Sequence, residues 1–154
     1  MKSPLKLALF LFAFSVIVVS CGKDEDEDPI VPNNTDLLTA HEWIMTNLTL
    51  AFPLNGLNVW DSIPACERDD VFKFNTNSTG YFDEGVSKCD PSDLQIETFA
   101  WKWTNNETTI EIPEDSNEVT ILSNVVVTAT TLTAQTEYEE QGLTVTANLT
   151  FSTH

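Results

Sequence analysis

Cysteines, histidines and carboxylates are the side chains of this 154-residue chain that could carry chemistry, and there are three, two and 24 of them. His41 and His154 lie too far apart to suggest a ligand set, and Asp69 and Asp70 have no obvious partner acid for acid–base catalysis. Four further acidic residues could surround Ca²⁺ but lack the spacing of a calcium loop: Asp83, Glu84, Asp90 and Asp93. The sequence contains no glycine-rich phosphate loop, no Gly-x-Ser-x-Gly and no zinc motif. We therefore expect a protein that is not an enzyme and uses no metal or other cofactor.

The first cysteine, Cys21, follows a segment typical of secretion. Lys2 and Lys6 precede an apolar run at residues 7–19, which is shorter than the roughly 20 residues that span a bilayer. Residues 18–21, Val-Val-Ser-Cys, resemble a bacterial lipobox. The resemblance implies cleavage before Cys21 and attachment of acyl chains to it, which would anchor the protein to a membrane. A plain secretory signal with an incidental cysteine is the alternative.

An acidic, proline-containing segment follows Cys21. Residues 23–34 cannot bury enough apolar surface to fold and are expected to form an extended tether. They also resemble the acidic signals that direct some lipoproteins to the outer face of the outer membrane, although simple solvation of a linker would need the same composition. The predicted organisation is a signal peptide at 1–20, a tether at 21–34 and one domain at 35–154.

The formal charge of the chain is −17. Its few basic residues are scattered, so the chain lacks the basic stripe that a phosphate backbone requires, and nucleic-acid binding is not expected. The same charge repels anionic lipid head groups, so the acyl chains alone should hold the protein to a membrane.

The domain alternates apolar and polar residues with a period of two, which is typical of antiparallel strands with one buried face. A helical turn is expected at residues 36–40. Eight strands are then expected, at residues 43–52, 70–75, 79–84, 96–104, 108–112, 118–127, 130–139 and 143–151. Short connections favour hairpins, and an eight-stranded up-and-down barrel would leave no exposed edge. A two-sheet sandwich is the alternative.

Cys66 and Cys89 form an even pair in a chain that enters an oxidising compartment, and are expected to be disulfide-bonded. If Phe74 pairs with Tyr81 across the intervening hairpin, both cysteines lie at the same distance from its turn. Reactive thiols or a metal pair are alternatives that no CxxC motif or nearby histidine supports.

Residues 61–74 and the segments Asp83-Glu84-Gly85 and 88–93 resemble the bacterial lipocalin-like lipoprotein family. Leu38-Thr39-Ala40-His41-Glu42-Trp43 stands where that family has a Leu-Thr-Gly-x-Trp-type start, with His41 in the place of the lipocalin glycine. The resemblance covers about residues 37–103 and implies an eight-stranded barrel that could enclose a cavity. No ligand comes with it.

Aromatic residues could line such a cavity, or could simply fill it. The candidate interior set is Phe72, Phe74, Tyr81, Phe99, Trp101 and Trp103. Trp60, in a long loop, is interpreted as a lid or as an anchor for a partner. Asp61-Ser62-Ile63 resembles an O-glycosylation motif, which would modify Ser62.

Two functions are therefore expected as alternatives. The first is an outer-membrane lipoprotein, exposed at the cell surface, whose barrel binds a small apolar ligand. The second is an envelope module with a filled barrel that contacts a protein or glycan through its outward loops. In an up-and-down barrel the tether joins the end with the short turns, so the loops carrying Cys66 and Cys89 would point away from the membrane.

Overall fold

A computed structural model describes residues 32–52, 56–114, 118–140 and 142–154. The predicted signal peptide, the lipidation at Cys21 and the tether before residue 32 lie outside the described residues. Val31–His154 forms one compact unit. No helix in the described ranges is long and apolar enough to cross a membrane.

A short helix opens the unit, as the sequence predicts. Helix α1 spans Asn34–Ala40 and begins with a capping box, in which the Asn33 side chain accepts from the Asp36 backbone N–H and the Asp36 carboxylate accepts from that of Asn33. Leu38 of this helix is fully buried, and its carbonyl accepts a hydrogen bond from the Trp43 indole at 2.9 Å. Trp43 is also fully buried, so the helix packs onto the start of the sheet through these two side chains.

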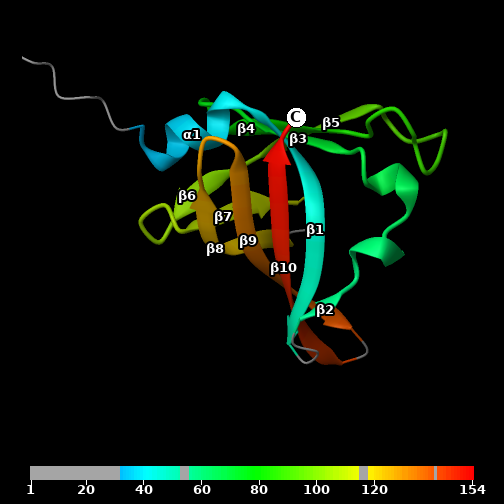
Figure 1. Ribbon diagram of the computed structural model, residues 1–154. Helices are drawn as coiled ribbons and strands as arrows, with labels where there is room; N and C mark the ends of the chain where they lie inside the picture. The colour runs from blue at the N-terminus through cyan, green and yellow to red at the C-terminus, as the bar shows by residue number, and fades with distance from the viewer. Residues whose placement is uncertain (1–31, 53–55, 115–117, 141) are drawn as a thin grey trace, which may run out of the picture. The chain divides into compact units, whose positions relative to one another are not determined.

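The rest of the unit is antiparallel β-sheet, which confirms the all-β prediction (Figure 1). The described strands are β1 (Glu42–Phe52), β2 (Leu57–Asn58), β3 (Val71–Phe74), β4 (Thr79–Asp83), β5 (Ile96–Ala100), β6 (Lys102–Thr104), β7 (Thr109–Pro113), β8 (Val119–Val127), β9 (Thr131–Glu140) and β10 (Leu143–Thr153). Two single-turn 3₁₀ helices, Trp60–Ser62 and Ala65–Glu67, lie between β2 and β3. Each of the eight predicted strands overlaps at least one of these elements.

The strands follow the order β5-β4-β3-β1-β10-β9-β8-β7-β6, with β2 beside β1. The first and last strands of the chain are therefore neighbours, and Figure 1 shows β10 in red alongside β1 in cyan. No backbone pairing joins β5 to β6. The hydrogen bonds between strands therefore do not close the predicted eight-stranded barrel. The predicted strand at 96–104 is instead divided at Trp101.

Trp101 explains this division. Its backbone N–H donates to the Ser78 carbonyl at 3.0 Å and its indole donates to the Thr79 carbonyl at 2.9 Å. With Trp101 held at the start of β4, β5 stays paired with β4, whereas β6 pairs with β7.

The hydrophobic core lies on the inner face of the sheet. Its largest fully buried side chains are Trp43, Leu38, Ile110 and Leu132. Strand β10 has the clearest pattern, because Val145, Ala147, Leu149 and Phe151 are buried and alternate with more exposed residues.

Candidate functional site

An apolar cavity of about 190 Å³ lies within the core. Its apolar lining comes from six strands, namely β1, β3, β7, β8, β9 and β10. Phe72 and Phe74 enter it from β3, and Leu149 and Phe151 from β10. Thr120 of β8 and Thr136 of β9 contribute its hydroxyl-bearing side chains. Such a cavity is suited to holding an apolar molecule.

Two of the seven predicted ligand-binding aromatics, Phe72 and Phe74, therefore line the cavity. Phe99, Trp101 and Trp103 pack beside it instead. The Phe74 ring lies 5.6 Å from the Phe99 ring and 5.4 Å from the Trp101 ring, and Trp101 lies 6.0 Å from Trp103, all edge to face. These three residues support the cavity wall from behind.

Tyr81 lies on the opposite face of the sheet from the one expected. The structure pairs Phe74 with Gly80 and Lys73 with Tyr81, one residue away from the predicted register. The cause is the turn before β4, where Ser78 has a φ of +63° and the Asn75 N–H donates to the Thr79 carbonyl at 2.7 Å. A slip of one residue moves a side chain to the other face.

Outside the cavity, Tyr81 donates a hydrogen bond to the Glu42 carboxylate. This bond lowers the pKa of Glu42 and raises the pKa of Tyr81 to about 12. His154 Nδ1 lies 3.5 Å from the same carboxylate, so three polar groups gather where the C-terminus meets the start of β1. They are a structural contact on the outer face.

Trp60 is held against its own loop. The Arg68 guanidinium lies 5.5 Å from the centre of the Trp60 ring, and donates to the carbonyls of Ile63 at 2.9 Å and Asp61 at 2.8 Å. The indole does not line the cavity, and its roles as a lid or as an anchor for a partner stay predictions. Ser62, in the same loop, is exposed, and its O-glycosylation stays a prediction.

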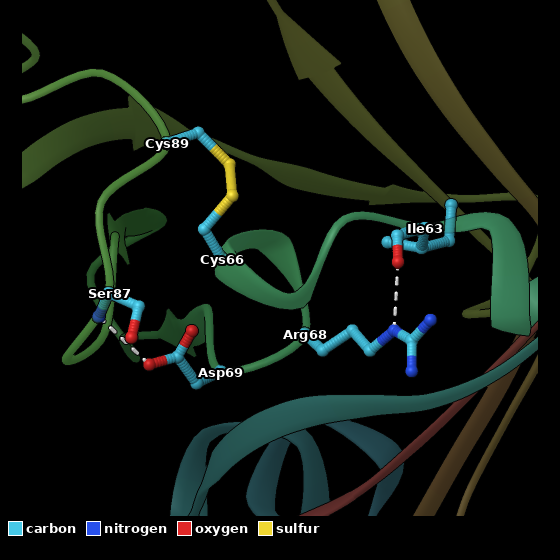
Figure 2. Close-up of a disulfide and its surroundings, with 6 residues drawn as sticks. All are labelled: Ile63, Cys66, Arg68, Asp69, Ser87 and Cys89. Carbon is cyan, nitrogen blue, oxygen red and sulfur yellow. Dashed lines mark hydrogen bonds between the residues drawn. A yellow bond between two sulfur atoms is a disulfide. The ribbon is translucent and has the colours of Figure 1, made fainter.

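Cys66 and Cys89 form the predicted disulfide, with a Cα–Cα distance of 5.2 Å (Figure 2). It joins the loop before β3 to the loop after β4. The Asp69 carboxylate holds the same two loops together, because it accepts from the backbone N–H groups of Val86 at 2.8 Å and Ser87 at 3.0 Å. The disulfide thus forms despite the difference in register, since loops can adjust where strands cannot.

Asp70, immediately before β3, is the least solvated carboxyl in this region. It is 9% exposed, and its Oδ1 has no hydrogen-bond partner among the residues that the structure describes. Burial, together with the like charges of neighbouring acids, Glu84 and Asp69 foremost, raises the pKa of Asp70 to about 6. No group of three or more potential metal ligands occurs within the described ranges. Asp70 is thus a titratable group without an evident ligand or partner.

A second hollow, of about 740 Å³, opens between β8 and β9. We call its edges the seam, meaning residues 119–122 of β8 and residues 136–139 of β9. Thr120 and Thr136 belong to this hollow and also line the apolar cavity, so the two spaces adjoin there. No local sequence pattern indicates the seam or most of the cavity lining, although the alternation in β10 is consistent with Leu149 and Phe151 facing inward.

Comparison with known proteins adds no assignment. No family model matches the chain, and no curated protein matches it either.

Proposed function

We propose that this protein is a membrane-anchored, lipocalin-like lipoprotein of the bacterial cell envelope that binds a small apolar molecule. The observation that carries the proposal is the apolar cavity of about 190 Å³. An engineered apolar cavity of about 150 Å³ remains dry and binds benzene. A space of this kind is more favourable for an apolar guest than for water, because it offers few polar partners.

The proposal treats the sheet as a barrel with one broken strand. Three observations support this: β1 pairs with β10, β5 and β6 are separated only by Trp101, and β5 contacts β7. A barrel of eight strands is just large enough to hold one small ligand.

The envelope location rests on the N-terminal sequence. Residues 18–21 and the acidic segment after them support a lipid anchor at Cys21 and display on the outer face of the outer membrane. The Cys66–Cys89 disulfide adds support, because such bonds persist in oxidising compartments. Intact-mass analysis should find a mature chain that starts at an acylated Cys21. A chain retaining residues 1–20, or starting at an unmodified residue, would refute the anchor.

The ligand proposal can be tested on a chain of residues 22–154, which keeps the whole compact unit. Benzene, toluene and cyclohexane serve as probes in ligand-observed NMR and in thermal unfolding. We expect binding, and an increase in unfolding free energy of about 1.4 kcal/mol when the free probe is at ten times its Kd. Failure of all three probes to bind would refute the proposal.

A matched pair of variants locates the binding. Leu149→Trp places a large ring in the cavity and should abolish probe binding. Leu143→Trp makes the same change in the same strand at a residue that is 61% exposed, and should bind as the unmodified chain does. Equal binding by both variants would place the probe elsewhere.

A second function, contact with a protein or glycan, is favoured by the apolar residues exposed on the connection from β4 to β5 and at the start of β5. Val86 is 96% exposed, Leu94 66% and Ile96 52%. Under this alternative, replacing all three by serine abolishes binding to whole envelopes, whereas Leu149→Trp leaves it unchanged. The converse result would favour the ligand-binding function.

A further inference from the structure

The seam is a place where two neighbouring strands stop pairing. Strands β8 and β9 pair at Ser123–Gln135, Val126–Thr133 and Val127–Leu132. Among the described strands, residues 119–122 of β8 pair only with β7, and residues 136–139 of β9 pair only with β10. Two strand edges, each with free backbone N–H and C=O groups, therefore face one another across the hollow.

A bulge in β8 opens the seam. Asn124 has a φ of +50°, and the neighbouring Val125 N–H donates to the Thr108 carbonyl at 2.9 Å, not to β9. A bulge bends its strand and increases the local twist. On the N-terminal side of Asn124, the first half of β8 stays paired with β7. This edge of β8 therefore diverges from the edge of β9. The opening is therefore built into the sheet and does not depend on a loop.

The opening leads to the apolar cavity. Thr120 and Thr136 lie on opposite edges of the seam and line both spaces. Deeper in, Leu122 and Leu132 line the cavity, whereas Val119, Ile121 and Tyr138 of the outer hollow are nearly half exposed. A molecule lying across the two threonines would have one end in an apolar interior and the other at the solvent.

The outer hollow is lined by four carboxylates and by no basic side chain: Glu114, Glu118, Glu137 and Glu139. Three of them accept hydrogen bonds from threonine hydroxyls, and none forms a salt bridge within the described residues. The described part of the chain contains four lysine and arginine residues, and each of them bonds elsewhere. Arg68, Lys73 and Lys88 donate to carbonyl oxygens. Lys102 forms a salt bridge with Glu111. No basic side chain of the described residues therefore neutralises the negative charge at the opening.

We propose that the seam is the entrance to the cavity and that the ligand is a cationic amphiphile, with an apolar chain in the cavity and an ammonium group at the seam. The free carbonyls of the strand edges and the glutamate carboxylates accept hydrogen bonds from the ammonium group. A fatty acid has the same apolar chain but is repelled by the carboxylates. This inference rests on the proposed function, because it requires the cavity to accept an apolar chain.

Three probes of equal length separate charge from apolarity: n-octylamine, n-octanol and n-octanoate, each below its aggregation concentration. Using residues 22–154 in isothermal titration calorimetry at low salt, we expect octylamine to bind at least about tenfold more tightly than octanol, and octanoate to bind most weakly. The preference should shrink at 1 M salt because exposed charges are screened. Equal affinities for amine and alcohol would overturn the ligand class.

Variants test the entrance and the charges separately. Thr120→Phe places a ring where the two spaces adjoin and should abolish octylamine binding, whereas Val126→Phe, on an exposed part of the same strand, should not. Glu118→Gln with Glu137→Gln should reduce the preference for amine over alcohol at least about threefold. Removing two charges elsewhere, with Asp61→Asn and Glu97→Gln, should leave it unchanged. Thermal unfolding confirms that each variant is folded.

The outcomes separate this inference from the proposed function. If benzene binds but octylamine shows no preference over octanol, the charge selection is wrong and the cavity function stands. If octylamine binds Thr120→Phe as tightly as the unmodified chain, the seam is not the entrance. If neither benzene nor any octyl probe binds, both proposals fail. NMR shift changes confined to residues 119–122, residues 136–139 and the cavity lining are the expected signature of binding.

Discussion

Asp70 should make this protein less stable as the pH rises from acid to neutral, and the substitution Asp70→Asn should remove that loss. The carboxyl is 9% exposed, and no described residue forms a hydrogen bond with its Oδ1. Its neighbours Glu84 and Asp69 add negative charge and offer no compensation. Asn has nearly the same shape as Asp but no charge, so the variant removes the ionisation and keeps the packing.

The magnitude follows from the shift in pKa. The pKa of Asp70 rises from 3.8 to about 6 on folding. Each pH unit corresponds to about 1.4 kcal/mol, so the full effect is about 3 kcal/mol. The folded state binds this proton more tightly than the unfolded state does. The stabilisation is therefore present in full below about pH 4 and is lost as the pH rises through about 6.

The measurement is urea unfolding of the unmodified chain and of Asp70→Asn at pH values from 3.5 to 8. The difference in unfolding free energy should grow in favour of Asp70→Asn by about 3 kcal/mol between about pH 4 and pH 7. Taking the difference removes the other carboxyls, such as Glu42, whose lowered pKa acts in the opposite direction. Asp61→Asn, which makes the same charge change at an exposed side chain, serves as the control. A flat difference for Asp70→Asn would refute the reasoning.

Three further substitutions test the framework. Replacing Cys66 and Cys89 together by alanine should lower the unfolding free energy by about 3 kcal/mol, because a bridge across 23 residues restricts the unfolded chain; an unchanged urea midpoint would contradict this. Gly80→Ala should destabilise by roughly 1–3 kcal/mol or more, since its Cβ would lie 2.3 Å from the Phe99 ring and 2.4 Å from a backbone oxygen; wild-type stability in calorimetry would argue against this packing. Trp43→Phe should lower the unfolding free energy by about 1–3 kcal/mol, because it leaves the buried Leu38 carbonyl without its donor. A decrease below about 0.5 kcal/mol would count against that hydrogen bond.

Much of the fold could be predicted because strands leave local marks in a sequence. In β10, Leu149 and Phe151 alternate with polar residues, and the structure places both against the cavity. The turn residues between such segments mark where strands end. The helical turn after Asn33 carries its own capping residues. Each of these features depends on neighbours within a few positions in the chain.

The predicted register of β3 with β4 and the predicted strand at 96–104 were wrong because the backbone conformation at one residue changed the pairing of a whole strand. Ser78 adopts a positive φ, which shifts the β3–β4 register and places Tyr81 outside. Trp101 bonds to the start of β4 and divides a strand that alternates without interruption. Neither residue type signals its role, because serine and tryptophan are ordinary in turns and strands.

The sequence by itself therefore determined which segments are strands, that a short helix precedes them and that Cys66 and Cys89 lie close enough to bond. Tertiary structure alone decided the burial of Asp70, the 190 Å³ cavity and the seam beside it. The physical reason is that alternation specifies the face of each residue, whereas cavities and open edges depend on how remote strands pair. The bulge at Asn124 ends the pairing of β8 with β9. No local sequence pattern indicates that the two strands separate there and leave the seam open.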